Sequence, residues 1–178
     1  QGAPLDQEWM LILDRLHGRR RHPHRHRQMG EARRARVSGS VVEIRDAASV
    51  SAARLLVRET AGAAGLSIPQ VESLAIIVSE LATNQHRYAG GGSVHTRLIR
   101  RNGVAGVEIE AADHGPGIAD PTQAFAGEVR SPGSLGIGLA GVRRLALEVD
   151  VDTRKGEGTR ILARVFAGDL SSRNTQAR

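Results

Sequence analysis

The chain has 178 residues, of which 40% are hydrophobic, and this is typical of one folded domain with short extensions. It has no cysteine, which excludes disulfide frameworks, thiolate zinc sites and cysteine nucleophiles. The net charge of +6 is concentrated in residues 1–40, which hold nine arginines against four acidic residues. Aromatic residues are too scarce for single-stranded nucleic-acid binding by stacking, and no apolar run reaches the roughly 20 residues of a membrane span. We therefore expect a cytoplasmic protein without a membrane or nucleic-acid partner.

Residues 1–40 are predicted to form a basic, disordered extension. The arginine- and histidine-rich segment 18–27 has no apolar face, so it cannot build a packed core. An arm that contacts nucleic acid or an anionic surface, and a histidine-rich metal tract, are the alternatives. Residues 168–178 are polar and are predicted to fray, which leaves 41–167 as the folded domain.

The first half of this domain carries clear start and stop signals. In chain order the patterns predict a strand, two helices and two strands, over 41–44, 46–64, 67–89, 94–99 and 104–112. Asp46 is placed to cap the first helix, and Gly65 to end it. Ser67 and Gln70 have the spacing of a capping box at the start of the second helix. A turn at 101–103 joins the two later strands.

The second half is predicted to contain a loop rich in glycine and proline, a short helix and a final hairpin. These elements cover 113–138, 139–147, and the strands 149–153 and 160–166. The order predicts an α+β sandwich, in which helices cover one face of an antiparallel or mixed sheet.

Glu80 and Asn84 form the first candidate site. They are four residues apart, so they share one face of the second helix. An amide oxygen is a suitable hard ligand for Mg²⁺, and a nearby carboxylate can accept a proton from a nucleophile. Taken alone, the pair is more typical of an ordinary exposed polar pair on a helix than of a catalytic site.

Asp113, Gly115 and Gly117 directly follow a predicted strand. The glycines permit either a sharp turn or the close approach of a flat ligand. Asp113 can accept a hydrogen bond from an exocyclic amino group such as that of adenine, or it can cap the turn.

Two further glycine-rich segments complete the set. The segment 133–139 opens a helix, where free backbone N–H groups can face an anion. The segment 156–159 lies on the final hairpin, and its local pattern indicates a turn.

The four motifs together resemble the GHKL ATPases, which share the Bergerat fold. Within that superfamily the chain is most similar to the small bacterial serine kinases and anti-sigma factors of the RsbT-like type. The resemblance covers about residues 41–166 and implies a two-layer sandwich with helices on one face of a mixed, mostly antiparallel sheet. It rests on segments 78–84, 88–90, 113–118, 133–145 and 156–159.

The resemblance implies ATP and Mg²⁺ as cofactors and gives each motif a role. Glu80 would be the catalytic base on an acceptor serine, and Asn84 would hold Mg²⁺. Arg87 would reach the phosphates, and Thr159 would help to hold adenine through water. Asp113 would bind the adenine amino group beside Gly115, Gly117 and Ile118. The lid and phosphate cradle would comprise Gly133, Ser134, Leu135, Gly136, Ile137, Gly138 and Leu139.

The implied function is a serine/threonine kinase that phosphorylates a serine of a STAS-domain antagonist in a partner-switching pathway. Such a kinase, once released, would activate a PP2C-type phosphatase. The alternative is a direct anti-sigma factor that binds a sigma factor under ATP control. The sequence departs from the family pattern at Gln85 and His86, where apolar or small residues are expected, and at the lid entry 129–132.

Overall fold

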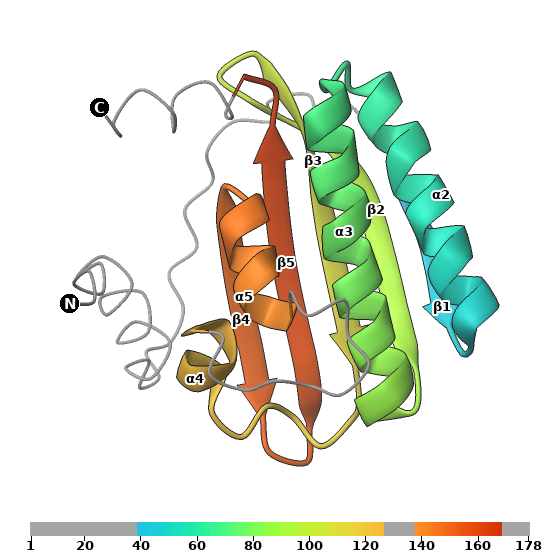
Figure 1. Ribbon diagram of the computed structural model, residues 1–178, viewed down its shortest axis with the longest axis vertical. Coiled ribbons are helices and arrows are strands. Elements are labelled where there is room, and N and C mark those ends of the chain that lie inside the picture. The colour runs from blue at the N-terminus through green and yellow to red at the C-terminus, as the bar shows by residue number, and fades with distance from the viewer. Residues whose placement is uncertain (1–38, 127–137, 169–178) are drawn as a thin grey trace, which may run out of the picture. The chain divides into compact units, whose positions relative to one another are not determined.

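The computed structural model describes residues 39–126 and 138–168, which form one helix layer on one sheet (Figure 1). The strands are β1 (Ser40–Ile44), β2 (Gly92–Arg101), β3 (Val104–Asp113), β4 (Glu148–Arg154) and β5 (Gly158–Phe166). The helices are α2 (Ala47–Ala63), α3 (Ile68–Asn84), α4 (Pro121–Ala126) and α5 (Gly138–Leu145), with a π-helical turn η1 (Gln85–Ala89) after α3. The strand order is β1-β2-β3-β5-β4. Every pairing among these strands is antiparallel, which confirms the predicted α+β sandwich and removes the mixed-sheet option.

Helix α2 begins and ends as its sequence predicts. Asp46 Oδ1 accepts the Ser49 backbone N–H at 2.8 Å, and Ser49 Oγ accepts the Asp46 N–H at 3.0 Å. At the other end Gly65 adopts φ +70° and donates to the Gly62 carbonyl, while the Leu66 N–H donates to the Ala61 carbonyl. These two bonds are a Schellman motif, which satisfies carbonyls that the helix end would leave without partners.

The end of α3 differs from the prediction of one helix up to residue 89. The α-helix ends at Asn84, and the next five residues form the wider turn η1. The Gln85 carbonyl then accepts the N–H groups of both Gly90 and Gly91. Gly90 has φ +72° and Gly91 φ +133°, which turns the chain into β2. A π-turn of this kind is often found at functional sites.

The predicted loop 113–138 contains a helix that the sequence analysis missed. Asp120 Oδ1 accepts the Gln123 N–H at 3.0 Å, and Pro121 occupies the first position of α4. An aspartate followed by proline is a helix-start signal, but six residues are too few to show an apolar stripe.

The core lies between the helices and one face of the sheet. Figure 1 shows α2, α3 and α5 lying over that face. Its fully buried side chains come from both layers and include Val57, Leu74, Ile77, Val78, Val94, Val107 and Ile109. Among residues 39–126 and 138–168, no helix is long and apolar enough to cross a membrane.

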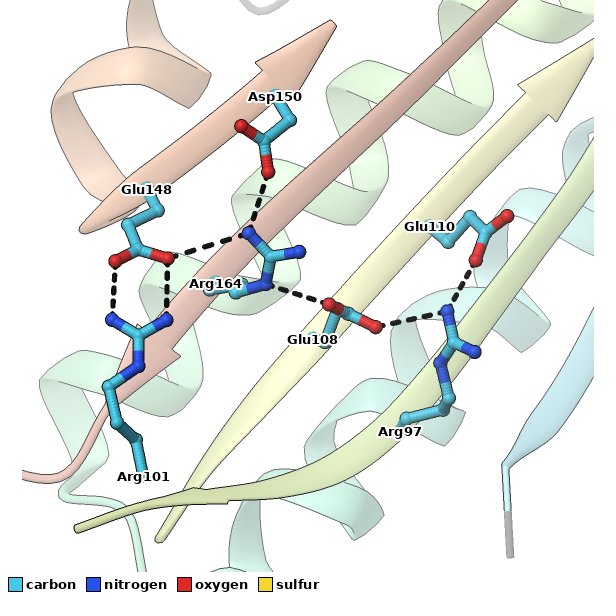
Figure 2. A network of polar contacts seen from close by, with 7 residues as sticks. All are labelled: Arg97, Arg101, Glu108, Glu110, Glu148, Asp150 and Arg164. Carbon is cyan, nitrogen blue, oxygen red and sulfur yellow. Dashed lines mark hydrogen bonds and ion pairs between the residues drawn. The ribbon is translucent and has the colours of Figure 1, made fainter. Parts of the chain in front are cut away.

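The opposite face of the sheet carries a lattice of ion pairs across β2, β3, β5 and β4 (Figure 2). Arg164 joins Glu108 and Asp150, each at 2.7 Å. Arg101 makes a bidentate contact with Glu148. Arg97 lies between Glu108 and Glu110. Because strand side chains alternate between faces, these charged residues make this face polar while their neighbours fill the core.

We expect acid to weaken this lattice. The hydrogen bond from Arg160 holds the pKa of Glu110 below its usual value, and the bond from Arg101 does the same for Glu148. A carboxyl whose pKa is lower in the folded state stabilises the fold above its unfolded pKa of about 4.5, and this contribution is lost as pH falls through the folded pKa. Because the arginines are half exposed, each pair contributes about 1 kcal/mol or less.

The measurement is the free energy of unfolding in urea at pH 7, 5, 4 and 3. We expect a decline below about pH 5 that is shallower in a Glu110→Gln/Glu148→Gln variant. Equal pH dependence in the two proteins would show that other groups govern the acid transition.

Candidate functional site

A cavity of about 250 Å³ lies where α3, η1, β3, β5, α4 and the start of α5 meet. The sequence-predicted residues that it brings together are Asn84, Asp113, Gly117, Ile118, Gly138, Leu139 and Thr159. Leu81, Ala111 and Ile161 give it apolar walls. An apolar slot with a few polar groups is the usual form of a small-ligand site.

Asp113 is held at the end of β3 by two backbone donors. Its Oδ1 accepts the Gly115 N–H at 2.9 Å and the Thr159 N–H at 3.2 Å. Thr159 is paired with Asp113 across β3 and β5, so the sheet register fixes the second bond. Within the described part of the chain both hydrogen bonds of this carboxylate end on Oδ1. Asp113 Oδ2 therefore remains as an acceptor for a ligand in the cavity that the residue lines.

The glycines around Asp113 bring protein segments together. A Cβ on Gly117, which has φ +76°, would lie 2.3 Å from the Arg154 carbonyl oxygen. A Cβ on Gly158, which has φ +100°, would lie 2.0 Å from the Asp113 carbonyl oxygen. A Cβ on Gly115 would lie 2.5 Å from the Ala89 Cβ. Of the two roles that the sequence left open, the structure supports close packing in a sharp turn, and close approach to a ligand stays a prediction.

Comparison with known proteins places this arrangement in a family. Residues 44–165 match the model of the histidine kinase-like ATPase domain. The chain is 36% identical over 124 residues to the serine/threonine-protein kinase RsbT of Bacillus subtilis (strain 168), which covers 70% of this chain and 93% of that protein. The chain belongs to the RsbT-like branch of the histidine kinase-like ATPases. The resemblance stated from the motifs is thereby confirmed.

Thr153 does not line the cavity of this RsbT-like site but contacts two residues that do, and it was missed from the sequence. Its Oγ1 accepts the Ile118 N–H at 2.9 Å and lies 3.0 Å from Thr159 Oγ1. It therefore fixes the loop after β3 to the final hairpin, at the point where Thr159 enters the cavity wall. The sequence predicted the hairpin but placed Thr159 in the turn rather than in the last strand, so the pairing of Thr153 with Thr159 across β4 and β5 was not recognised.

The remaining predicted site residues do not line the cavity or lie outside the described residues. Glu80 is only 2% exposed on α3, one turn before Asn84, and is not among the residues that line the cavity. Arg87 is exposed on η1 and also lies outside the lining. The lid residues Gly133, Ser134, Leu135, Gly136 and Ile137 lie outside the described residues. Their roles stay predictions, as do the domain boundaries.

The donor set of the cavity fits a magnesium nucleotide. Asn84 presents an amide oxygen, which Mg²⁺ accepts as a ligand, and Asp113 supplies an acceptor for an exocyclic amino group. Gly138, with φ +56°, opens α5, whose first N–H groups have no partner within the helix and can face phosphate. The apolar walls suit the faces of a purine ring.

Proposed function

We propose that this RsbT-like chain is a protein kinase that transfers the γ-phosphoryl group of Mg-ATP to a serine of a STAS-domain antagonist protein. The observation that carries the proposal is that Asn84, Asp113 and Thr159 line one cavity. The cavity belongs to a chain that matches a serine/threonine-protein kinase over 93% of that protein. The predicted cofactors, ATP and Mg²⁺, are part of the proposal.

Each site residue has a specific task in this proposal. Asp113 Oδ2 accepts a hydrogen bond from the adenine amino group. Thr159, on the neighbouring strand β5, helps to hold the adenine ring through water. Asn84 holds Mg²⁺, which when bound neutralises charge on the phosphates. Glu80 accepts the proton of the serine hydroxyl as its oxygen bonds to the γ-phosphorus. The bond from that phosphorus to the β–γ bridging oxygen breaks, and ADP leaves.

Serine phosphorylation would act on the partner through charge. A phosphoserine carries about −2 charge at neutral pH, which disrupts a contact surface that is complementary to the unmodified side chain. This is the basis for proposing a partner-switching role, in which the released kinase then binds a PP2C-type phosphatase.

The test is incubation of the full chain with Mg-ATP and a STAS-domain protein encoded beside it, followed by mass spectrometry of both proteins. The proposal expects one phosphoserine on the STAS-domain protein. Tight capture of a sigma factor, with no phosphate on any STAS-domain protein, would favour the direct anti-sigma alternative and contradict the kinase proposal.

Replacing Asp113 with asparagine is expected to weaken ATP binding by about tenfold to a hundredfold. Asp113 Oδ1 already accepts two backbone N–H groups, so the new side chain must keep its oxygen there and turn its NH₂ toward the ligand. Two donors then face each other when adenine is bound. ITP has an acceptor at that ring position, so the variant should lose much less affinity for ITP.

The measurement is the Kd of each nucleotide by calorimetry. Asp46→Asn is the matched control, because Asp46 Oδ1 also accepts a backbone N–H but caps α2. An equal loss for ATP and ITP in Asp113→Asn would contradict the assignment of Asp113 to the adenine amino group.

A further inference from the structure

Two buried glutamines, one near the start of helix α3 and one directly after its end, donate side-chain hydrogen bonds to carbonyl groups of the sheet. Near its start, Gln70 Nε2 donates to the Phe166 carbonyl at the end of β5, at 2.7 Å. Directly after its end, Gln85 Nε2 donates to the Ser93 carbonyl on β2 at 3.1 Å and to the Ala112 carbonyl on β3 at 3.0 Å. Both side chains are only 3% exposed.

Packing alone does not explain a glutamine at position 85. Its Oε1 is buried and has no hydrogen-bond partner among the described residues, so burial of this acceptor opposes folding. The neighbouring backbone is also constrained, because a Cβ on Gly92 would lie 2.8 Å from Gln85 Cδ. An apolar side chain, of the kind the family pattern leads us to expect here, would fill the space without an unsatisfied acceptor.

The position of Gln85 connects the two polar ends of the nucleotide site. It follows Asn84 directly in the chain, and the carbonyl that it binds belongs to Ala112, which directly precedes Asp113. Gln85 also lines the cavity. Asp113 itself is fixed by Gly115 and Thr159, so the Gln85 amide adds the link between the end of α3 and the strand that carries the aspartate.

We propose that Gln85 is a positioning residue that sets the separation between Asn84 and Asp113, so that one nucleotide engages both. This inference rests on the proposed function, since it assumes that Asn84 serves the metal-phosphate end and Asp113 the adenine end. Loss of the Gln85 amide should therefore affect a ligand that spans both ends much more than one that reaches only Asp113.

The experiment compares Gln85→Met with Gln70→Met in the full chain. Both variants replace a buried amide, near the start of α3 or directly after its end, by an apolar side chain of similar size, so both should lower the thermal unfolding temperature. We measure the Kd of Mg-ATP and of adenosine for each by calorimetry. Gln85→Met is expected to lose about tenfold in ATP affinity and to keep its adenosine affinity, and Gln70→Met to keep both.

The outcomes separate this inference from the proposed function. Equal losses of ATP and adenosine affinity in Gln85→Met, or an equal ATP loss in Gln70→Met, would show a general structural role and overturn the positioning role. Absence of ATP binding by the unaltered chain would instead overturn the proposed function. If Gln85→Met does not fold, Gln85→Leu also removes the NH₂ donor without adding a charge beside the phosphates, and it carries the same expectation.

Discussion

Replacing Glu80 with glutamine is expected to slow serine phosphorylation by about 10²- to 10⁴-fold while Mg-ATP still binds. Glutamine has nearly the same size, so the buried position on α3 is still filled, but an amide does not accept the proton of the serine hydroxyl. Because Glu80 does not line the cavity, nucleotide affinity should change little. The measurements are the initial rate of phosphoserine formation by mass spectrometry and the Kd of Mg-ATP by calorimetry.

The matched control for this variant is Glu72→Gln on the same helix. Glu72 is exposed and pairs with Arg58 of α2 at 2.7 Å, so its loss should change stability little and leave phosphorylation unchanged. Phosphorylation at the normal rate by Glu80→Gln would show that another group is the base. Parallel losses of rate and ATP affinity would assign Glu80 to nucleotide binding.

The largest loss of stability is expected from Gly158→Ala, at about 3–5 kcal/mol. Gly158 has φ +100°, and a Cβ there would lie 2.0 Å from the Asp113 carbonyl oxygen and 2.8 Å from the His114 Cα. Relief of this clash must separate β5 from the end of β3. The same movement would pull the Thr159 N–H from Asp113 Oδ1, so ATP affinity should fall as well.

Two other glycines separate the contributions of backbone strain and steric clash. Gly156 has φ +77°, but no described atom beyond its chain neighbours lies within 4 Å of the place that an alanine methyl group would take, so Gly156→Ala should cost only about 1–2 kcal/mol. Gly62 lies inside α2 in open space, so Gly62→Ala should stabilise by up to about 1 kcal/mol. Urea unfolding gives all three values, and a loss in Gly158→Ala no larger than that in Gly156→Ala would contradict the clash.

Local signals predicted those parts of the fold that depend on neighbouring residues. Asp46 caps α2 as expected, and the turn after residue 101 is formed by Asn102 with φ +50° and Gly103 with φ +82°. Such positions are determined by the chemistry of one turn, because only certain residues satisfy its backbone or adopt its angles. The same holds for Gly65 at the end of α2.

Contacts between distant segments were harder to predict. Asp113 and Thr159 are 46 residues apart, and from local patterns each was compatible with an ordinary turn. Only the joint resemblance of the motifs to a known family put them in one site. Gln85 was recognised merely as a departure, because its role depends on strand carbonyls that the sheet topology brings to it. Thr153 depends in the same way on the β4–β5 register.

The most direct test of the account is a calorimetric titration of ATP into the full chain, with and without Mg²⁺. We expect one nucleotide site per chain. Asn84→Ala should weaken binding only when Mg²⁺ is present, and Asp113→Asn should weaken it under both conditions. Absence of binding, or an affinity that neither substitution changes, would contradict the convergence of these residues on one nucleotide.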